Sequence, residues 1–150
     1  MKNNKGFSLV ELIIVIAIMA ILVGVMAPQL IKYIEKTNVS ADTQLADTCK
    51  TALTTAMMDP AIVTISGYSQ PTGGNFSANI NAGSTQATSA FNDALLETLG
   101  VSAMNQVYGK LKSKDATGIS FSVVNSNQIV ITVTGSHADG KGGATPIVVQ

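Results

Sequence analysis

The sequence is poor in the residues on which many functions of small proteins depend. It contains no arginine, one cysteine and one histidine, and only 12% of its 150 residues are charged. Nine lysines balance nine acidic residues, so no basic surface is expected to hold nucleic acid. One histidine is too few to assemble a nucleophile, a base and an orienting acid, so an enzyme is the least expected class and no cofactor is expected.

The single cysteine and histidine also limit how the fold is held together. Cys49 has no partner for an intrachain disulfide, so packing and hydrogen bonds must stabilise the fold, and a buried thiol is favoured over a reactive one. His137 lies near one carboxylate, Asp139, in a glycine-rich loop. These two side chains do not make a coordination set, so the sequence favours a solvated turn over a metal site.

What is present is a short basic start followed by a long apolar run. Lys2 and Lys5 precede Gly6, and sixteen apolar residues follow Glu11, from Leu12 to Ala27. A helix that begins at Phe7 and runs to Ala27 would be roughly 31 Å long, about the thickness of a bilayer core. A charged side chain at bilayer depth costs roughly 2.5–3.5 kcal/mol, so Glu11 needs a partner outside the monomer or must snorkel to the headgroups.

The join at Gly6 resembles the N-terminus of the type IV pilin family, which includes the pseudopilins. The resemblance rests on the basic leader, on the stretch Gly6-Phe7-Ser8-Leu9-Val10-Glu11-Leu12, on the apolar run and on Pro28 after it. It covers about the first thirty-six residues. Many family members staple a C-terminal loop with a disulfide, and this chain departs from that pattern.

The resemblance implies processing and self-assembly. A prepilin peptidase is expected to cut between Gly6 and Phe7, after which the new amine of Phe7 is methylated. In the family, the glutamate that matches Glu11 pairs with the N-terminal amine of a neighbouring subunit. Burying such a pair in an apolar bundle sets the axial register more than it adds stability.

Gly24 and Pro28 are expected to weaken the helix near the end of the apolar run. Proline removes a backbone donor and clashes with the carbonyl four residues earlier, which here belongs to Gly24. The resemblance implies that this stretch melts when subunits assemble, whereas a static kink is the plainer alternative. Two other interpretations of the run remain, a secretory signal cut after Ala27 and an uncleaved membrane anchor.

The apolar period continues beyond Pro28, so one helix is predicted to extend to Met58, where Asp59-Pro60 ends it. We therefore expect three segments, a leader over 1–6, a membrane or filament-core helix over 7–28 and a globular head over 29–150 that includes the amphipathic half of the helix. The predicted buried stripe of that half contains Leu30, Ile34, Ala41, Leu45, Cys49, Ala52, Leu53 and Ala56.

The rest of the chain predicts a small α+β head. Residues 61–88 are rich in Ser, Thr, Asn and Gly and are expected to form a long exposed connection with a turn at 71–74. A short helix is predicted from a cap at Thr88 or Ser89 to Leu99, ended by Gly100. Residues 101–111 favour neither a helical turn nor an irregular stretch.

The C-terminal third alternates in the manner of strands. Ile119–Val123 and Ile129–Val133 predict an antiparallel hairpin, and 146–149 a third, edge strand. The inward side chains expected in this sheet are Phe121, Val123, Ile129, Ile131 and Val133, or those of the opposite face. The fold class is thus α+β, a long N-terminal helix packed against a small antiparallel sheet, with the lollipop architecture of pilins.

The function expected from the resemblance is that of a type IV pilus subunit, polymerising through its N-terminal helix for adhesion, motility or aggregation. The expected partners are copies of itself, prepilin peptidase, the inner-membrane pilus assembly machinery and the membrane before assembly. The chain would cross the cell membrane once and later reside in a surface pilus. A pseudopilin or minor pilin of a secretion or DNA-uptake system is the first alternative, and a membrane-tethered monomeric binding module is the second.

Overall fold

The structure, a computed structural model, describes residues 7–124, 128–135 and 147–150. The chain divides into two compact units, residues 1–34 and 35–150, which are described separately. The first helix, α1 (Leu9–Met58), contributes to both. The observed α+β class, with a long N-terminal helix and a small antiparallel sheet, confirms the predicted fold class.

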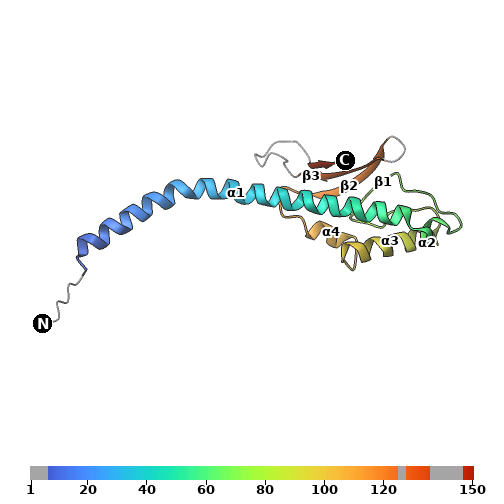
Figure 1. Cartoon of the computed structure of the whole chain (residues 1–150), viewed down its shortest axis with the longest axis horizontal. Helices are drawn as coiled ribbons and strands as arrows, with labels where there is room; N and C mark the ends of the chain where they lie inside the picture. Colours follow the sequence, from blue (N-terminus) through green and yellow to red (C-terminus); the bar gives the residue numbers. More distant parts are fainter. Residues whose placement is uncertain (1–6, 125–127, 136–146) are drawn as a thin grey trace. The chain divides into compact units, whose positions relative to one another are not determined.

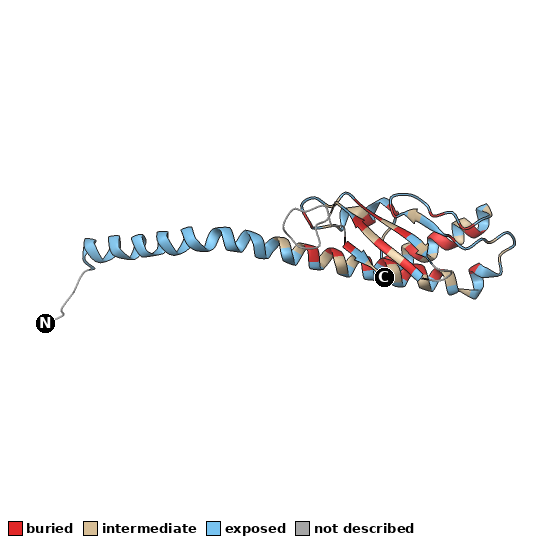
Figure 2. Ribbon diagram, turned by 90° about the horizontal axis from the view of Figure 1, so that it is seen from above, coloured by how far each residue is buried: buried red, intermediate tan, exposed pale blue. Residues whose placement is uncertain are grey.

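The first unit is the apolar part of α1. Every described residue from Phe7 to Ile34 is exposed, as Figure 2 shows by its uniform pale blue. Leu30 and Ile34 were predicted to lie on the buried stripe and are 60% and 53% exposed, so that part of the prediction is wrong. The physical reason is that none of the described residues buries the surface of α1 before Glu35.

The second unit contains the remainder of α1, three further helices and a four-stranded antiparallel sheet in the order β1-β2-β3-β4. The helices are α2 (Pro60–Val63), α3 (Thr85–Leu99) and α4 (Asn105–Gly109). The strands are β1 (Gly73–Asn75), β2 (Gly118–Val124), β3 (Gln128–Thr134) and β4 (Ile147–Val149). In Figure 1 the sheet lies on one side of the second half of α1, and α3 and α4 lie on the other.

The predicted hairpin is present. β2 and β3 pair in antiparallel register with Phe121 opposite Ile131, and β4 pairs with β3 as the predicted edge strand. Ile119, Phe121, Ile131 and Val133 face the core, whereas Val123 is half-buried. The turn expected at 125–127 lies outside the described residues.

The connection over 61–88 differs from its prediction. It contains α2 and the edge strand β1, and it buries Ile62, Phe76 and Ile80 in the core. Phe76 packs edge-to-face on Phe121 of the sheet with ring centroids 6.0 Å apart. Polar composition suggested an exposed loop, but a few large apolar side chains are enough to hold a segment against a core.

Helix α3 begins earlier than predicted. Ser84, not Thr88 or Ser89, is the N-cap, and its hydroxyl accepts a hydrogen bond from the Ala87 backbone N–H at 3.3 Å. The predicted end is confirmed, because Gly100 adopts a left-handed conformation with φ 60°. α4 lies within 101–111, where the sequence favoured neither structure.

The buried stripe of α1 is also rotated from the predicted one. Cys49, Ala52, Leu53 and Ala56 are buried as expected, whereas Ala41 and Leu45 are only half-buried. The residues that complete the stripe are Val39, Asp42 and Ala46. Asp42 thus occupies a buried position at which the helical period predicts an apolar side chain.

Candidate functional site: the N-terminal helix segment

The start of α1 is held by a reciprocal pair of hydrogen bonds. The backbone N–H of Ser8 donates to the Glu11 carboxylate at 2.9 Å, and the Val10 N–H donates to the Ser8 hydroxyl at 3.3 Å. Ser8 and Glu11 are three residues apart at the entry to the helix, which is the arrangement of a capping box. The carboxylate therefore satisfies one of the unpaired N–H groups at the helix start and lies at the positive end of the helix dipole.

This arrangement gives Glu11 a partner within the chain, which the sequence analysis missed. The sequence analysis expects either a partner outside the monomer or a side chain that snorkels to the headgroups. The signal was available, because Ser8-Leu9-Val10-Glu11 before an apolar run is the sequence signature of a capping box. The N–H donor lowers the cost of carrying the carboxylate at the edge of an apolar segment, but it does not neutralise the charge.

Phe7 stands at the described beginning of the chain and is 89% exposed. The predicted cleavage bond joins it to Gly6, which lies outside the described residues. α1 contains the one stretch of the described residues that is long and apolar enough to cross a membrane, and none of that stretch is buried by the rest of the chain. A removable signal sequence has the same property, so burial alone does not separate the alternatives.

Gly24 and Pro28 lie within a helix that is assigned without interruption from Leu9 to Met58. A side chain built at Gly24 would meet no atom within 4 Å, so no contact within the chain requires a glycine there. Proline at 28 leaves the Gly24 carbonyl without its helical donor. The predicted kink or melting at this point stays a prediction.

Asp42 is the polar residue of the second unit that the sequence analysis overlooked. It is 0% exposed, and its two carboxylate oxygens accept hydrogen bonds from the backbone N–H groups of Lys112 at 2.7 Å and Ser113 at 2.9 Å. About two helical turns earlier on α1, the Glu35 carboxylate accepts a longer hydrogen bond of 3.4 Å from the Lys114 backbone N–H. These two acids fasten residues 112–114 to α1. A charged residue on an otherwise apolar stripe was the signal for this contact.

The remaining candidate group that the structure describes is Cys49. Cys49 is fully buried, and burial raises the pKa of its thiol to about 12, with nearby Lys110 opposing the shift. The thiol is therefore protonated at neutral pH and packs as a small apolar group. His137 and Asp139 lie outside the described residues. Within the described ranges, no three His, Cys, Asp or Glu side chains are grouped to hold a metal ion.

Comparison with known proteins finds matches at the N-terminal segment. Residues 1–27 match the family described as the prokaryotic N-terminal methylation motif. A fimbrial protein of Moraxella nonliquefaciens is 46% identical over 55 residues, which are 37% of this chain and 36% of that protein. A fimbrial protein of Pseudomonas aeruginosa is 39% identical over 59 residues, which are 39% of this chain and 38% of that protein.

The matched region is thus little more than a third of each relative's length, and no solved structure matches the chain. For the residues beyond the matched region, the comparisons add nothing to what the structure itself shows. The methylation motif and the fimbrial relatives nevertheless agree with each other and with the exposed apolar half of α1. Together they show that the N-terminal third of the chain is similar to that of fimbrial proteins and carries the prokaryotic N-terminal methylation motif.

Proposed function

We propose that this chain is a structural subunit of a type IV pilus that polymerises through its N-terminal helix. The observation that carries the proposal is a methylation motif over residues 1–27 that continues into a helix whose apolar half is fully exposed. A face of that size must meet lipid before assembly and other copies of itself afterwards. The resulting surface filaments would serve adhesion, motility or aggregation.

The pathway begins with processing. Prepilin peptidase cuts between Gly6 and Phe7 and the Phe7 amine is methylated. The helix over 7–28 holds the subunit in the membrane until the inner-membrane pilus assembly machinery moves it into the filament. The removal of Lys2 and Lys5 with the leader shifts the side-chain charge of the chain from zero to about −2.

Glu11 has two functions in this scheme. In the separate subunit it closes the capping box with Ser8, and in the filament it pairs with the Phe7 amine of a neighbour. The two are compatible, because a carboxylate has two oxygens and about four acceptor positions, of which the Ser8 N–H uses one. The cap also restricts the Glu11 side chain to the helix start, close to the terminus where a partner amine must bind.

The test separates the two functions of Glu11 with two substitutions. Glu11→Gln keeps an acceptor for the capping box and removes the charge, whereas Ser8→Ala removes the capping hydroxyl and keeps the charge. Each variant is expressed as the only copy of the subunit, and membrane levels are compared with sheared filaments. Glu11→Gln is expected to reach the membrane normally and to reduce filament yield by more than about 10-fold.

Four outcomes would contradict parts of this proposal. Normal filaments from Glu11→Gln would remove the pairing function, and an equal defect in Ser8→Ala would assign the effect to the cap. Wild-type protein that never enters filaments would favour a membrane-tethered binding module. Wild-type protein that enters filaments only as a scarce component would favour a pseudopilin or minor pilin.

Processing is tested by the intact mass of the membrane and surface forms. We expect a chain that begins at Phe7 and carries one added methyl group. A surface form that begins at Pro28 would indicate an ordinary secretory signal, and retention of Met1 would indicate an uncleaved anchor. Gly6→Leu is a suitable control, because a bulky side chain should hinder the close approach of a protease to the backbone.

A further inference from the structure

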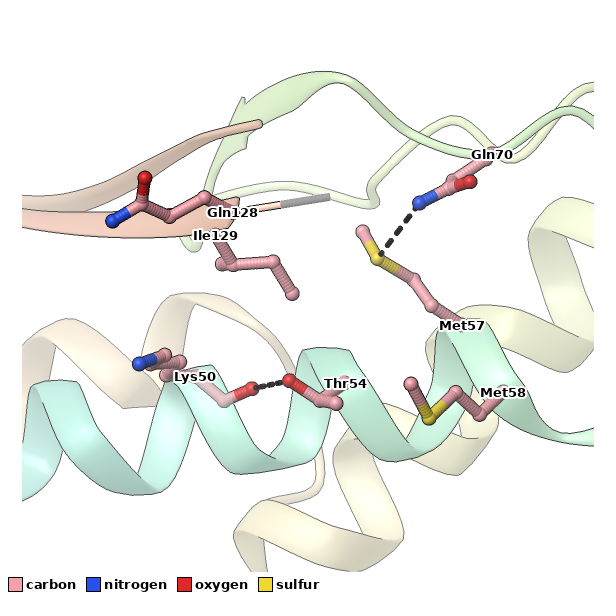
Figure 3. Close-up of a pocket in the computed structure, with 7 residues that line it drawn as sticks. All are labelled: Lys50, Thr54, Met57, Met58, Gln70, Gln128 and Ile129. Carbon is pink, nitrogen blue, oxygen red and sulfur yellow. Dashed lines mark hydrogen bonds between the residues drawn. The ribbon is translucent and has the colours of Figure 1, made fainter. Parts of the chain in front are cut away.

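A cavity of about 450 Å³ lies in the second unit, between the C-terminal part of α1 and the start of β3. Figure 3 shows its walls. α1 contributes Lys50, Thr54 and Met57, β3 contributes Gln128 and Ile129, and Gln70 reaches in from the segment after α2. This volume is within the range of small-ligand sites, roughly 300–1,000 Å³.

The polar groups of this cavity are mainly hydrogen-bond donors. Lys50 supplies an ammonium group that has no ion-pair partner in the described part of the chain, and none of the 7 lining residues has a carboxylate. Asp47, three residues earlier on α1, is exposed and is not part of the lining. The Thr54 hydroxyl already donates to the Lys50 carbonyl at 2.8 Å, so toward a ligand it can only accept.

The Gln70 amide can bind a ligand at little cost, because the hydrogen bond that it would give up is weak. The Gln70 side-chain N–H donates to the Met57 sulfur at 3.8 Å, and a thioether is a weak acceptor. A carboxylate would be a much better partner for that N–H, because charge-assisted hydrogen bonds are roughly twice as strong as neutral ones. Gln128 lines the cavity at the start of β3, but it is exposed and its amide points away from Gln70 in Figure 3.

The apolar part of the lining suits the body of such a ligand. Ile129 and Met57 project into the space between the polar groups (Figure 3). Methionine side chains are flexible and polarisable, so they adapt to irregular apolar groups. The cavity therefore combines the Lys50 cation and the Gln70 amide with an adaptable apolar wall.

We propose that this cavity binds a small carboxylate with an apolar body, with its charge on Lys50 and its apolar part on Met57 and Ile129. Both a short acyl chain and the C-terminal end of an apolar peptide have this chemistry. The site goes beyond the proposed function and does not depend on it, because no residue of the cavity belongs to the N-terminal segment used in assembly.

The test uses the full chain in nanodiscs of zwitterionic lipid, with the methionine methyl groups labelled for NMR. The probes are hexanoate and acetyl-valyl-leucine, each compared with its amide. We expect saturable shifts of the Met57 methyl signal with a dissociation constant of about 1 mM or tighter. The amides should bind more weakly by about 10-fold or more, because they lose the charge-assisted bond.

Substitutions locate the site and give its control. Lys50→Gln should weaken binding of either carboxylate by about 10-fold or more, whereas Lys112→Gln makes the same charge change at an exposed lysine outside the cavity and should not. Tighter binding of the peptide or of the acid identifies the source of the ligand. Absence of a saturable shift, equal binding of the amides, or an unchanged affinity in Lys50→Gln would overturn the proposal. Filament formation by Lys50→Gln is expected to be normal. A negative result in the binding experiment would therefore not count against the proposed assembly function.

Discussion

At the scale of single residues, a buried polar side chain of the second unit has both of its oxygens hydrogen-bonded. The Asp42 carboxylate is buried and accepts two backbone N–H groups from residues that are distant in sequence. A buried carboxylate is tolerated only when hydrogen bonds replace its hydration, and here the two donors approach one oxygen each. Asp42 therefore connects α1 to the segment before β2 more specifically than an apolar side chain would.

Asp42→Asn tests this connection. The amide keeps the shape of the side chain but has only one acceptor oxygen, and its NH₂ group would face a backbone N–H. We expect the free energy of unfolding to fall by about 2 kcal/mol. Chemical unfolding of the full chain, followed by tyrosine fluorescence, measures it. Asp47→Asn, at an exposed position of the same helix, should change it by less than about 0.5 kcal/mol, and similar losses in both variants would contradict the connection.

The buried thiol of Cys49 predicts a loss of stability in alkali. Its pKa is raised from 9.0 to about 12 by burial, so the unfolded chain releases this proton at a lower pH than the folded chain does. Its contribution to stability is therefore fully present below pH 9.0 and is lost as the pH rises toward about 12.

The slope of this loss is measurable. The free energy of unfolding should fall by up to about 1.4 kcal/mol per pH unit between these two values from this group alone. Cys49→Ala should lower stability at neutral pH but should show a shallower decline in alkali. Burial also raises the pKa of Tyr68, so Tyr68→Phe should be measured as well. An identical alkaline slope in wild type and Cys49→Ala would contradict the assignment.

At the scale of elements, the polar segment between α2 and α3 is fixed by backbone contacts that require glycine. Gly83 has φ 98° and pairs with Tyr68 in an isolated bridge. A Cβ atom there would lie 2.1 Å from the Gly67 carbonyl oxygen, which is far too close. The same carbonyl accepts the Ser84 N–H at 2.9 Å, so this contact sets where α3 begins.

Gly83→Ala should therefore be severely destabilising. We expect a loss of more than about 3 kcal/mol, because both a left-handed conformation and a backbone clash oppose the substitution. The matched control is Gly100→Ala, which also has positive φ but where a Cβ atom meets nothing within 4 Å. That variant should lose only about 1 kcal/mol. Thermal unfolding of the two full-length variants compares them, and equal losses would mean that the contact with Gly67 is unimportant.

At the scale of the whole molecule, the two units have different requirements. The unit over 35–150 has a hydrophobic core of its own, whereas the described residues of the apolar part of α1, from Phe7 to Ile34, are all exposed. The first unit can therefore be changed without unfolding the second. The function proposed at this scale is assembly, which would depend on how the exposed part of α1 behaves when copies pack together.

Pro28→Ala tests whether the helix must loosen during assembly. Alanine restores the donor for the Gly24 carbonyl and favours an interior helical position by about 3 kcal/mol over proline. We expect normal membrane levels and a lower yield of sheared filaments, because the stiffened helix resists melting. Met26→Leu, a neutral exchange in the same stretch, should assemble normally. An unchanged yield in Pro28→Ala would support the static alternative.

Local signals account for what the sequence determined by itself. The apolar run, the capping signature at Ser8 and Glu11, the stop at Asp59-Pro60, the glycine cap at Gly100 and the alternation of β2 and β3 depend on neighbours within a few residues. Each follows from backbone geometry or hydrophobic period, so helices, hairpin and fold class could be predicted. The capping box was readable in the same way, although we did not predict it.

The tertiary structure decided what depends on residues far apart in sequence. The position of α3's start, the burial of Phe76 against Phe121 and the bonding of Asp42 to residues 112 and 113 join distant segments. The cavity beside Lys50 likewise needs Gln70 and Gln128 to approach the same face of α1. The hydrophobic period of a helix or strand predicts which positions face inward, but it does not predict which residues they contact. The contacts of the buried Asp42 carboxylate and the lining of the cavity beside Lys50 therefore follow only from the tertiary structure.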